Sequence, residues 1–199
     1  MKYLKLISLL FVCMLGSLFV SCEETAEFDE YANWQERNKA FIDSIAKVAE
    51  TNTDGKWMKI LSFKLDSIDT QGNPTEHHVD DYIYCRIEQK GEGSEHPLYT
   101  DFVSVNYRGR LIPTVSQPKG PIFDESYGKD FNQSISIPRN FYVDELIVGW
   151  STALMNMTKG DRWHIYIPAN LGYGVQDKED IPAYSTLIFD LNLVNFSAE

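Results

Sequence analysis

Residues 186–196 read Thr-Leu-Ile-Phe-Asp-Leu-Asn-Leu-Val-Asn-Phe, with apolar side chains at nearly every second position. This period of two predicts a β-strand that buries one face. Similar alternation runs through residues 80–88, 101–111, 134–138 and 162–168, and polar turns separate these segments. Strands of this length joined by turns are typical of an antiparallel sheet.

A single short helix is expected between residues 144 and 157, among the strands. Asp144 can cap this helix, and the negative charge of Glu145 suits a helix N-terminus. Lys159-Gly160-Asp161 then turns the chain into the next strand. The apolar stripe of the helix comprises Leu146, Ile147, Trp150, Ala153, Leu154 and Met157. One short helix against an antiparallel sheet predicts the α+β class.

A second helix is expected before the strands, over residues 29–50. Such a helix either packs on its own domain or offers its apolar face to a partner, for example in a dimer. Residues 57–65 fit either a strand or a helix. The apolar face of the expected helix recurs at three- and four-residue steps and comprises Trp34, Asn38, Phe41, Ile42, Ile45, Val48 and Ala49.

The first 21 residues are typical of an export signal. Lys2 and Lys5 precede an apolar run of 15 residues, Leu6–Val20, which is short for a membrane span of about 20 residues. Ser21-Cys22 resembles the end of a bacterial lipobox, which implies removal of residues 1–21 and lipidation of Cys22. We then expect an acidic tether and helical extension over 22–78 and a folded domain over 79–199. The lipid would hold the protein on the periplasmic or outer-surface side of a bacterial membrane.

The composition argues against several classes of function. A net charge of −11 leaves no basic footprint for nucleic acid. The chain has no phosphate-binding glycine loop and no Gly-x-Ser-x-Gly elbow. Cys13 would leave with the signal and Cys22 would carry lipid, so Cys85 would have no disulfide partner. The four histidines lack the spacing of metal ligands: His77, His78, His96 and His164. We therefore expect neither a metal nor a cofactor.

Six motifs in the second half of the chain resemble one known family, the FKBP-type peptidyl-prolyl cis–trans isomerases. They are Val105-Asn106-Tyr107-Arg108-Gly109-Arg110-Leu111, Ile122-Phe123-Asp124-Glu125-Ser126, Leu146-Ile147-Val148-Gly149-Trp150, Met157-Thr158-Lys159-Gly160-Asp161-Arg162, Ile167-Pro168-Ala169-Asn170-Leu171-Gly172-Tyr173-Gly174 and Ile181-Pro182-Ala183-Tyr184-Ser185-Thr186-Leu187-Ile188-Phe189-Asp190-Leu191. The resemblance implies an antiparallel half-barrel sheet of about five strands, wrapped around one short helix, with an aromatic pocket between them.

The resemblance also implies roles for particular residues. Trp150 would form the floor under a proline ring, and the backbone amide of Ile147 would donate to a substrate carbonyl. The Tyr173 hydroxyl would donate to another carbonyl, while Asp124 would lie at the rim beside Tyr107. The implied catalytic residues are Tyr107, Phe123, Asp124, Ile147, Trp150 and Tyr173, and the implied substrate contacts are Leu146, Ile181 and Phe189.

Some segments depart from the family pattern. Residues 113–121 and 138–144 look longer than the corresponding loops. The family's additional aromatic residue has no clear match here, and Phe131 and Ile135 are both candidates. These departures bear on substrate preference and on macrolide affinity more than on basic activity.

The implied reaction is rotation about the Xaa-Pro peptide bond. Its barrier is about 18–20 kcal/mol, and uncatalysed exchange takes tens to hundreds of seconds. An apolar pocket with a few fixed donors can favour the twisted amide without a cofactor. We therefore expect an isomerase that assists the folding of exported proteins, takes proline-containing polypeptides and binds a macrolide inhibitor. The alternatives are a non-catalytic module that binds proline-containing segments, and a surface protein that binds glycans through exposed aromatic side chains.

Overall fold

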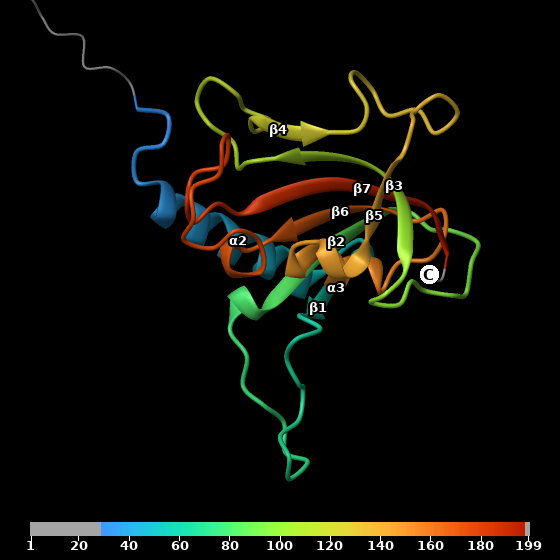
Figure 1. Cartoon of the computed structure of the whole chain (residues 1–199). Coiled ribbons are helices and arrows are strands. Elements are labelled where there is room, and N and C mark those ends of the chain that lie inside the picture. The colour runs from blue at the N-terminus through green and yellow to red at the C-terminus, as the bar shows by residue number, and fades with distance from the viewer. Residues whose placement is uncertain (1–28, 198–199) are drawn as a thin grey trace, which may run out of the picture.

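The structure is a computed structural model that describes residues 29–197 (Figure 1). It has the α+β class that the sequence predicts. Its helices are α2 (Trp34–Thr51) and α3 (Val148–Leu154), with the short 3₁₀ turns η1 (Val79–Asp81), η2 (Val143–Glu145) and η3 (Ala169–Leu171). Its strands are β1 (Trp57–Leu61), β2 (Tyr82–Gln89), β3 (Phe102–Arg110), β4 (Ile122–Glu125), β5 (Arg139–Tyr142), β6 (Arg162–Ile167) and β7 (Leu187–Ser197).

All seven strands join one antiparallel sheet, in the order β1-β2-β6-β7-β3-β4, with β5 paired to β3. The strands expected at residues 80–88, 101–111, 162–168 and 186–196 correspond to β2, β3, β6 and β7. The sheet has more strands than the expected number of about five. Strands β1 and β4, which are short and show little alternation of their own, complete its two edges.

The inner face of the sheet packs on α3 and forms the main core. Successive side chains on a strand point to opposite faces, so Ile83 and Cys85 of β2 enter this core whereas Tyr84 points to the outer face. Ala153 and Leu154 of α3 are fully buried against it. Each fully buried aliphatic side chain of this kind contributes about 1.5–3 kcal/mol.

Helix α2 packs on the outer face of the same sheet. Ile42 and Ala46 are buried against Tyr84 there. Near the start of the helix, the Asn38 side chain accepts a bond from the Thr186 amide (2.7 Å) and donates to the Trp34 carbonyl (2.8 Å). The expected helix over 29–50 is thus present, and it packs on its own chain, which is the first of the two alternatives for it.

The sequence interpretation is wrong at residues 134–138, which were expected to form a strand. They form turn and extended backbone, and Ile135 and Ile137 are 76% and 80% exposed. The edge of β3 pairs instead with Arg139–Tyr142, with Val103 opposite Phe141. Alternation alone does not make a strand when no neighbouring strand is left to supply hydrogen bonds.

The expected helix over 144–157 is also shorter than its pattern suggests. Asp144 lies in the separate turn η2 and is not the cap of α3, whose cap position is Ile147. Leu146 and Ile147 have extended backbone, with ψ angles of 164° and 148°. This break separates η2 from α3 and lies at two residues that the sequence assigned to the site.

The export signal, the lipidation residue Cys22 and the tether up to residue 28 lie outside the described residues. Within residues 29–197, no helix combines the length and the apolar character needed to cross a membrane. Strand β1 belongs to the segment expected as an N-terminal extension, yet it pairs with β2 along five residues. Cys85 is a buried free thiol.

Candidate active site

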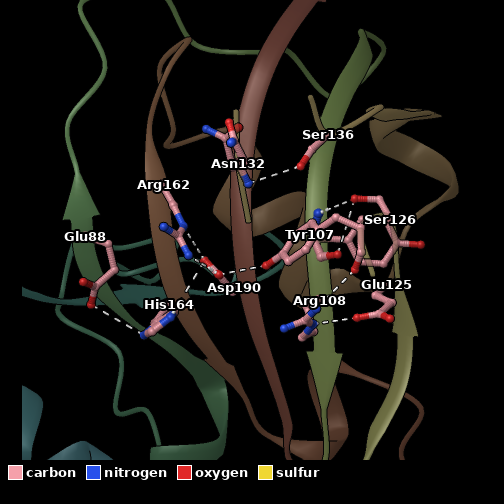
Figure 2. A network of polar contacts seen from close by, with 12 residues as sticks. Glu88, Tyr107, Arg108, Glu125, Ser126, Asn132, Ser136, Arg162, His164 and Asp190 are labelled. Atoms are coloured by element: carbon pink, nitrogen blue, oxygen red, sulfur yellow. Dashed lines mark hydrogen bonds and ion pairs between the residues drawn. The ribbon is translucent and has the colours of Figure 1, made fainter. Parts of the chain in front are cut away.

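Strand β3 carries Tyr107 and positions the site through its hydrogen bonds to β4 and to the residue after β4. Tyr107 points to the inner face and is 3% exposed. Its amide donates to the Ser126 hydroxyl (2.9 Å), and the Ser126 amide donates back to the Tyr107 carbonyl (2.9 Å), as Figure 2 shows from close by. These bonds fix the end of β4, so Phe123 and Asp124 are held next to Tyr107.

Two glycines allow the close packing around the site. A Cβ atom at Gly109 would lie 2.5 Å from the Phe123 ring and 2.7 Å from the Phe189 ring. A Cβ atom at Gly149 would lie 2.4 Å from Ile167. Because real Cβ contacts are longer than this, glycine is required for the two rings to approach β3 and for α3 to approach β6.

The inner side of the sheet and the start of α3 enclose a cavity of about 410 Å³. We call it the aromatic cavity. All nine residues that the sequence assigned to a site line it: Tyr107, Phe123, Asp124, Leu146, Ile147, Trp150, Tyr173, Ile181 and Phe189. Five further residues complete the lining: Phe141, Glu145, Lys178, Glu179 and Asp180. Five of the six motifs, spread over some 80 positions of the sequence, thus contribute residues to one place.

Trp150 lines the aromatic cavity and is 4% exposed. Its ring meets those of Tyr107 and Phe189 edge to face, with centroids 5.0 and 5.1 Å apart. Phe141 lies 6.0 Å from Trp150 and Phe123 lies 5.5 Å from Phe189, also edge to face. Edge-to-face pairs fix the orientation of each ring, so these side chains form an ordered apolar wall of the cavity.

One corner of the cavity is polar. The Tyr107 hydroxyl donates to Asp124 (2.6 Å), and Arg139 donates both to the Tyr107 oxygen (2.9 Å) and to Asp124 (3.1 Å). Burial, together with the bond to Asp124, raises the pKa of Tyr107 above its ordinary value. Burial opposes protonation of Arg139, but the charge of Asp124 and the Tyr107 oxygen keep the pKa of Arg139 above its usual range. The corner therefore holds the Asp124 side chain in place through two donors, Tyr107 and Arg139.

Asp124 lies at the rim and is not buried. Its side chain is 46% exposed and pairs with Arg139, which is 51% exposed. The desolvation cost of placing this acid beside apolar residues is therefore small, because solvent and Arg139 both compensate its charge.

Three hydrogen-bond donors around the cavity are free of acceptors within the described part of the chain. The break between η2 and α3 leaves the Ile147 amide unbonded, while the Ile147 carbonyl accepts from Trp150 and Ser151. The Tyr173 hydroxyl, on a residue 37% exposed, and the buried indole nitrogen of Trp150 also lack an acceptor there. Burial raises the pKa of Tyr173, so its hydroxyl remains a donor at neutral pH.

A short loop closes one side of the cavity. The amide of Lys178 donates to the Ile181 carbonyl (2.8 Å), and the Ile181 amide donates back (2.9 Å). Asp177 accepts from the Ala183 amide (2.8 Å). Residues 177–180 carry three carboxylates and one ammonium group, so the mouth of the cavity is acidic.

Sequence reasoning missed Phe141 and Arg139, which both come from β5. The additional aromatic was sought at Phe131 or Ile135, and neither lines the cavity: Phe131 packs on Tyr127, and Ile135 is exposed. The signal for Phe141 was the aromatic pair Phe141-Tyr142 beside the helix motif, but residues 138–144 were interpreted as a long loop.

No cluster of three or more potential metal ligands occurs among residues 29–197. The fold and the cavity define a class of protein: a curved antiparallel sheet around one short helix, with an aromatic cage opening between them. Residues 93–194 match the family described as FKBP-type peptidyl-prolyl cis-trans isomerase. This match covers half of the chain, and the chain belongs to that family.

Individual relatives agree with this assignment. The macrophage infectivity potentiator of Trypanosoma cruzi is 29% identical over 186 residues, covering 92% of this chain and 80% of that protein. The peptidyl-prolyl cis-trans isomerase Mip of Coxiella burnetii is 37% identical over 114 residues, covering 57% of this chain but only 44% of Mip. The crystal structure of FkpA from Escherichia coli has a TM-score of 0.54 and 26% identity over 84% of this chain and 64% of that one.

Proposed function

We propose that this chain catalyses cis–trans isomerisation of Xaa-Pro bonds in exported polypeptides, with the proline ring seated in the aromatic cavity. The observation that carries the proposal is the convergence of all nine expected residues on that cavity, with an unbonded amide of Ile147 at its mouth. Because the Mip relative is covered over less than half of its length, the activity of the whole protein is inferred from the site.

The geometry suits the chemistry of amide rotation. The planar amide is stabilised by conjugation, and the barrier of about 18–20 kcal/mol reflects its loss. A dry apolar cage favours the twisted amide, which has less charge separation, over the planar one. The Trp150 floor would hold the proline ring, while the Ile147 amide and the Tyr173 hydroxyl would anchor carbonyls on the two sides of the rotating bond. Asp124, fixed by Tyr107 and Arg139, would set the field at the amide carbonyl.

The test removes one donor without disturbing the fold. Tyr173→Phe deletes a hydroxyl at the cavity, and Tyr99→Phe deletes one on a residue of similar exposure (41%) that does not line the cavity. In a protease-coupled prolyl isomerisation assay, we expect Tyr173→Phe to lower kcat/KM about two- to tenfold, the value of one hydrogen bond. Tyr99→Phe should match the parent. Equal rates for all three proteins would contradict the assigned role.

A non-catalytic binding module is the second candidate. The long 113–121 segment and the acidic residues at the cavity mouth are the features that favour it. Such a module would bind a proline-containing peptide in the aromatic cavity, with affinity that Tyr173→Phe lowers, but would show no turnover. Measuring affinity and turnover with the same peptide separates the two functions.

Export and anchoring rest on the sequence of residues 1–22. The apolar run and the Ser21-Cys22 pair support a lipoprotein held at a bacterial membrane and facing the periplasm or the outside. Lipid on Cys22 would add about 0.8 kcal/mol of membrane affinity per buried methylene. We expect Cys22→Ala to move the protein from the membrane fraction to the soluble one. A variant that stays with the membrane would exclude the lipid anchor.

Two further partners are a macrolide, which the family resemblance implies, and a second copy of the chain, which the amphipathic pattern of residues 29–50 suggests. A macrolide inhibitor such as rapamycin would occupy the aromatic cavity and block turnover. Helix α2 packs its apolar face on its own sheet. Among the described residues of α2, Val48 is the one large aliphatic side chain that is exposed, so the structure gives little support for a dimer through this helix. Sedimentation analysis at several concentrations tests this directly, since a dimer would change the apparent mass.

A further inference from the structure

A second cleft lies on the outer face of the sheet, on the side away from the aromatic cavity. Its volume is about 400 Å³, within the range of about 300–1,000 Å³ typical of ligand sites. Tyr166 and Ile188 contribute to it from β6 and β7, Phe41 from α2, and Pro113 and Pro118 from the long loop after β3. We call it the outer cleft.

The outer cleft concentrates positive charge in an acidic protein. The cations Arg108, Arg110 and Lys119 line it together with His164 and a single carboxylate, Asp190. The whole chain has a net charge of −11. Figure 2 shows His164 of β6, Asp190 of β7 and Arg108 of β3 in this order across the face.

The carboxylates near the outer cleft already have partners. Glu125 pairs with Arg108 (2.6 Å), and Asp190 binds Arg162 and accepts from the Tyr127 hydroxyl (2.9 Å). Both carboxylates also attract Arg110 at longer range, but neither forms an ion pair with Arg110 or Lys119.

Arg110 is partly buried and has no carboxylate partner among the described residues. Its one hydrogen bond to the described residues goes to the Gly120 carbonyl (3.0 Å), and neither Arg110 nor Lys119 forms an ion pair with them. Partial burial, reinforced by repulsion from Arg108, lowers the pKa of Arg110, yet a guanidinium stays charged at neutral pH. A partly buried cation without a counterion is destabilising, and a bound anion relieves that cost.

We propose that the outer cleft binds an acidic polypeptide segment. A carboxylate of the segment accepts the unused N–H groups of Arg110, whose planar fork suits a carboxylate, and lies within the field of Lys119. A neighbouring apolar side chain of the segment packs on the Phe41–Tyr166 pair, whose rings are 6.2 Å apart. The apolar walls favour an anion attached to an apolar body over a bare ion.

The test compares two rhodamine-labelled peptides that contain no proline, acetyl-Ala-Glu-Phe-Glu-Ala and acetyl-Ala-Lys-Phe-Lys-Ala. Fluorescence anisotropy with the full chain in mild detergent, at low ionic strength, reports both affinities. We expect the acidic peptide alone to bind. Arg110→Gln should weaken it about tenfold or more, as expected for a charge-assisted contact, and Arg110→Lys should fall between. Lys47→Gln, which removes the same charge from an exposed site on α2, should bind like the parent.

Three outcomes would overturn the proposal. Equal affinity for the two peptides would remove the charge preference, and unchanged affinity in Arg110→Gln would place the peptide elsewhere. Inorganic phosphate that displaces the peptide at equal concentration would reduce the cleft to a bare anion site. If circular dichroism shows that Arg110→Gln does not fold, Lys119→Gln, at an exposed position, replaces it, with an expected loss of about two- to fivefold.

Discussion

The replacement of Gly109 by alanine would test the packing of the aromatic cavity most sharply. The added Cβ atom would lie 2.5 and 2.6 Å from two atoms of the Phe123 ring and 2.7 Å from the Phe189 ring. Carbon atoms in contact are normally about 3.5–4.0 Å apart. Both rings would therefore have to retreat by roughly 1 Å. Both rings line the aromatic cavity, and the edge-to-face contact of Phe189 with Trp150 leaves little room for it.

The expected magnitudes follow from this displacement. Overpacking of this kind costs about 1–3 kcal/mol of folding stability. For a chain of this size each kcal/mol lowers Tm by about 2–4 °C, so a fall of roughly 2–12 °C is expected. Misplacement of a site by about 1 Å can reduce rate by about 100-fold. We expect kcat/KM to fall at least about tenfold while the fold is retained.

Gly128→Ala is the matched control. No atom lies within 4 Å of a Cβ at Gly128, so this substitution should leave Tm and turnover unchanged, or raise Tm slightly through a less flexible unfolded chain. Thermal unfolding and the protease-coupled assay on both variants provide the comparison. If Gly109→Ala keeps parental turnover and stability, the two rings are not held against β3 as described, and the packing argument fails.

Three further outcomes are expected. Asn38→Ala leaves the buried Thr186 amide without its acceptor. Chemical denaturation should therefore show a free energy of unfolding lower by about 1–3 kcal/mol. An unchanged free energy would mean that this side chain does not hold α2 to the residue before β7. Burial by itself would raise the pKa of Asp190. The hydrogen bond and the positive charge of Arg162 outweigh burial, so the pKa of Asp190 lies below its ordinary value of 3.8. The stability this pair contributes is thus present above about pH 4 and lost as pH falls below it, and Asp190→Asn should flatten the acid limb of the stability–pH curve. The acidic residues 177–180 at the cavity mouth should favour peptides with lysine beside the proline over peptides with glutamate, about two- to fivefold at low salt and less at high salt; equal rates at low salt would exclude this electrostatic contribution.

Much of the fold could be predicted from hydrophobic periodicity. The long strands with one buried face, β2, β3, β6 and β7, have clear alternation because the core dictates every second residue. Strand β5 could not be found in this way, because it has four residues and its pairing with β3 depends on where the chain returns. Residues 134–138 show the reverse case, where alternation exists without a partner strand. Strand pairing depends on two segments, so the hydrophobic pattern of one segment alone does not predict it.

The site residues, like the strands, were predicted from the sequence in part. Residues from five of the six motifs meet at the aromatic cavity, whereas Met157-Thr158-Lys159-Gly160-Asp161-Arg162 contributes none. Phe141 and Arg139 come from β5 and were missed for the same reason that the strand was missed. The free amide of Ile147 was implied only by the family resemblance, since helical periodicity runs through the break and only backbone angles reveal it.

The most direct test of the central claim is a protease-coupled prolyl isomerisation assay on residues 23–199, with and without rapamycin. We predict turnover of an Xaa-Pro peptide well above the uncatalysed rate and its loss on addition of rapamycin, because both ligands would occupy the aromatic cavity. A protein that is folded by circular dichroism and shows no turnover would contradict the account of catalysis and leave the cavity as a binding site.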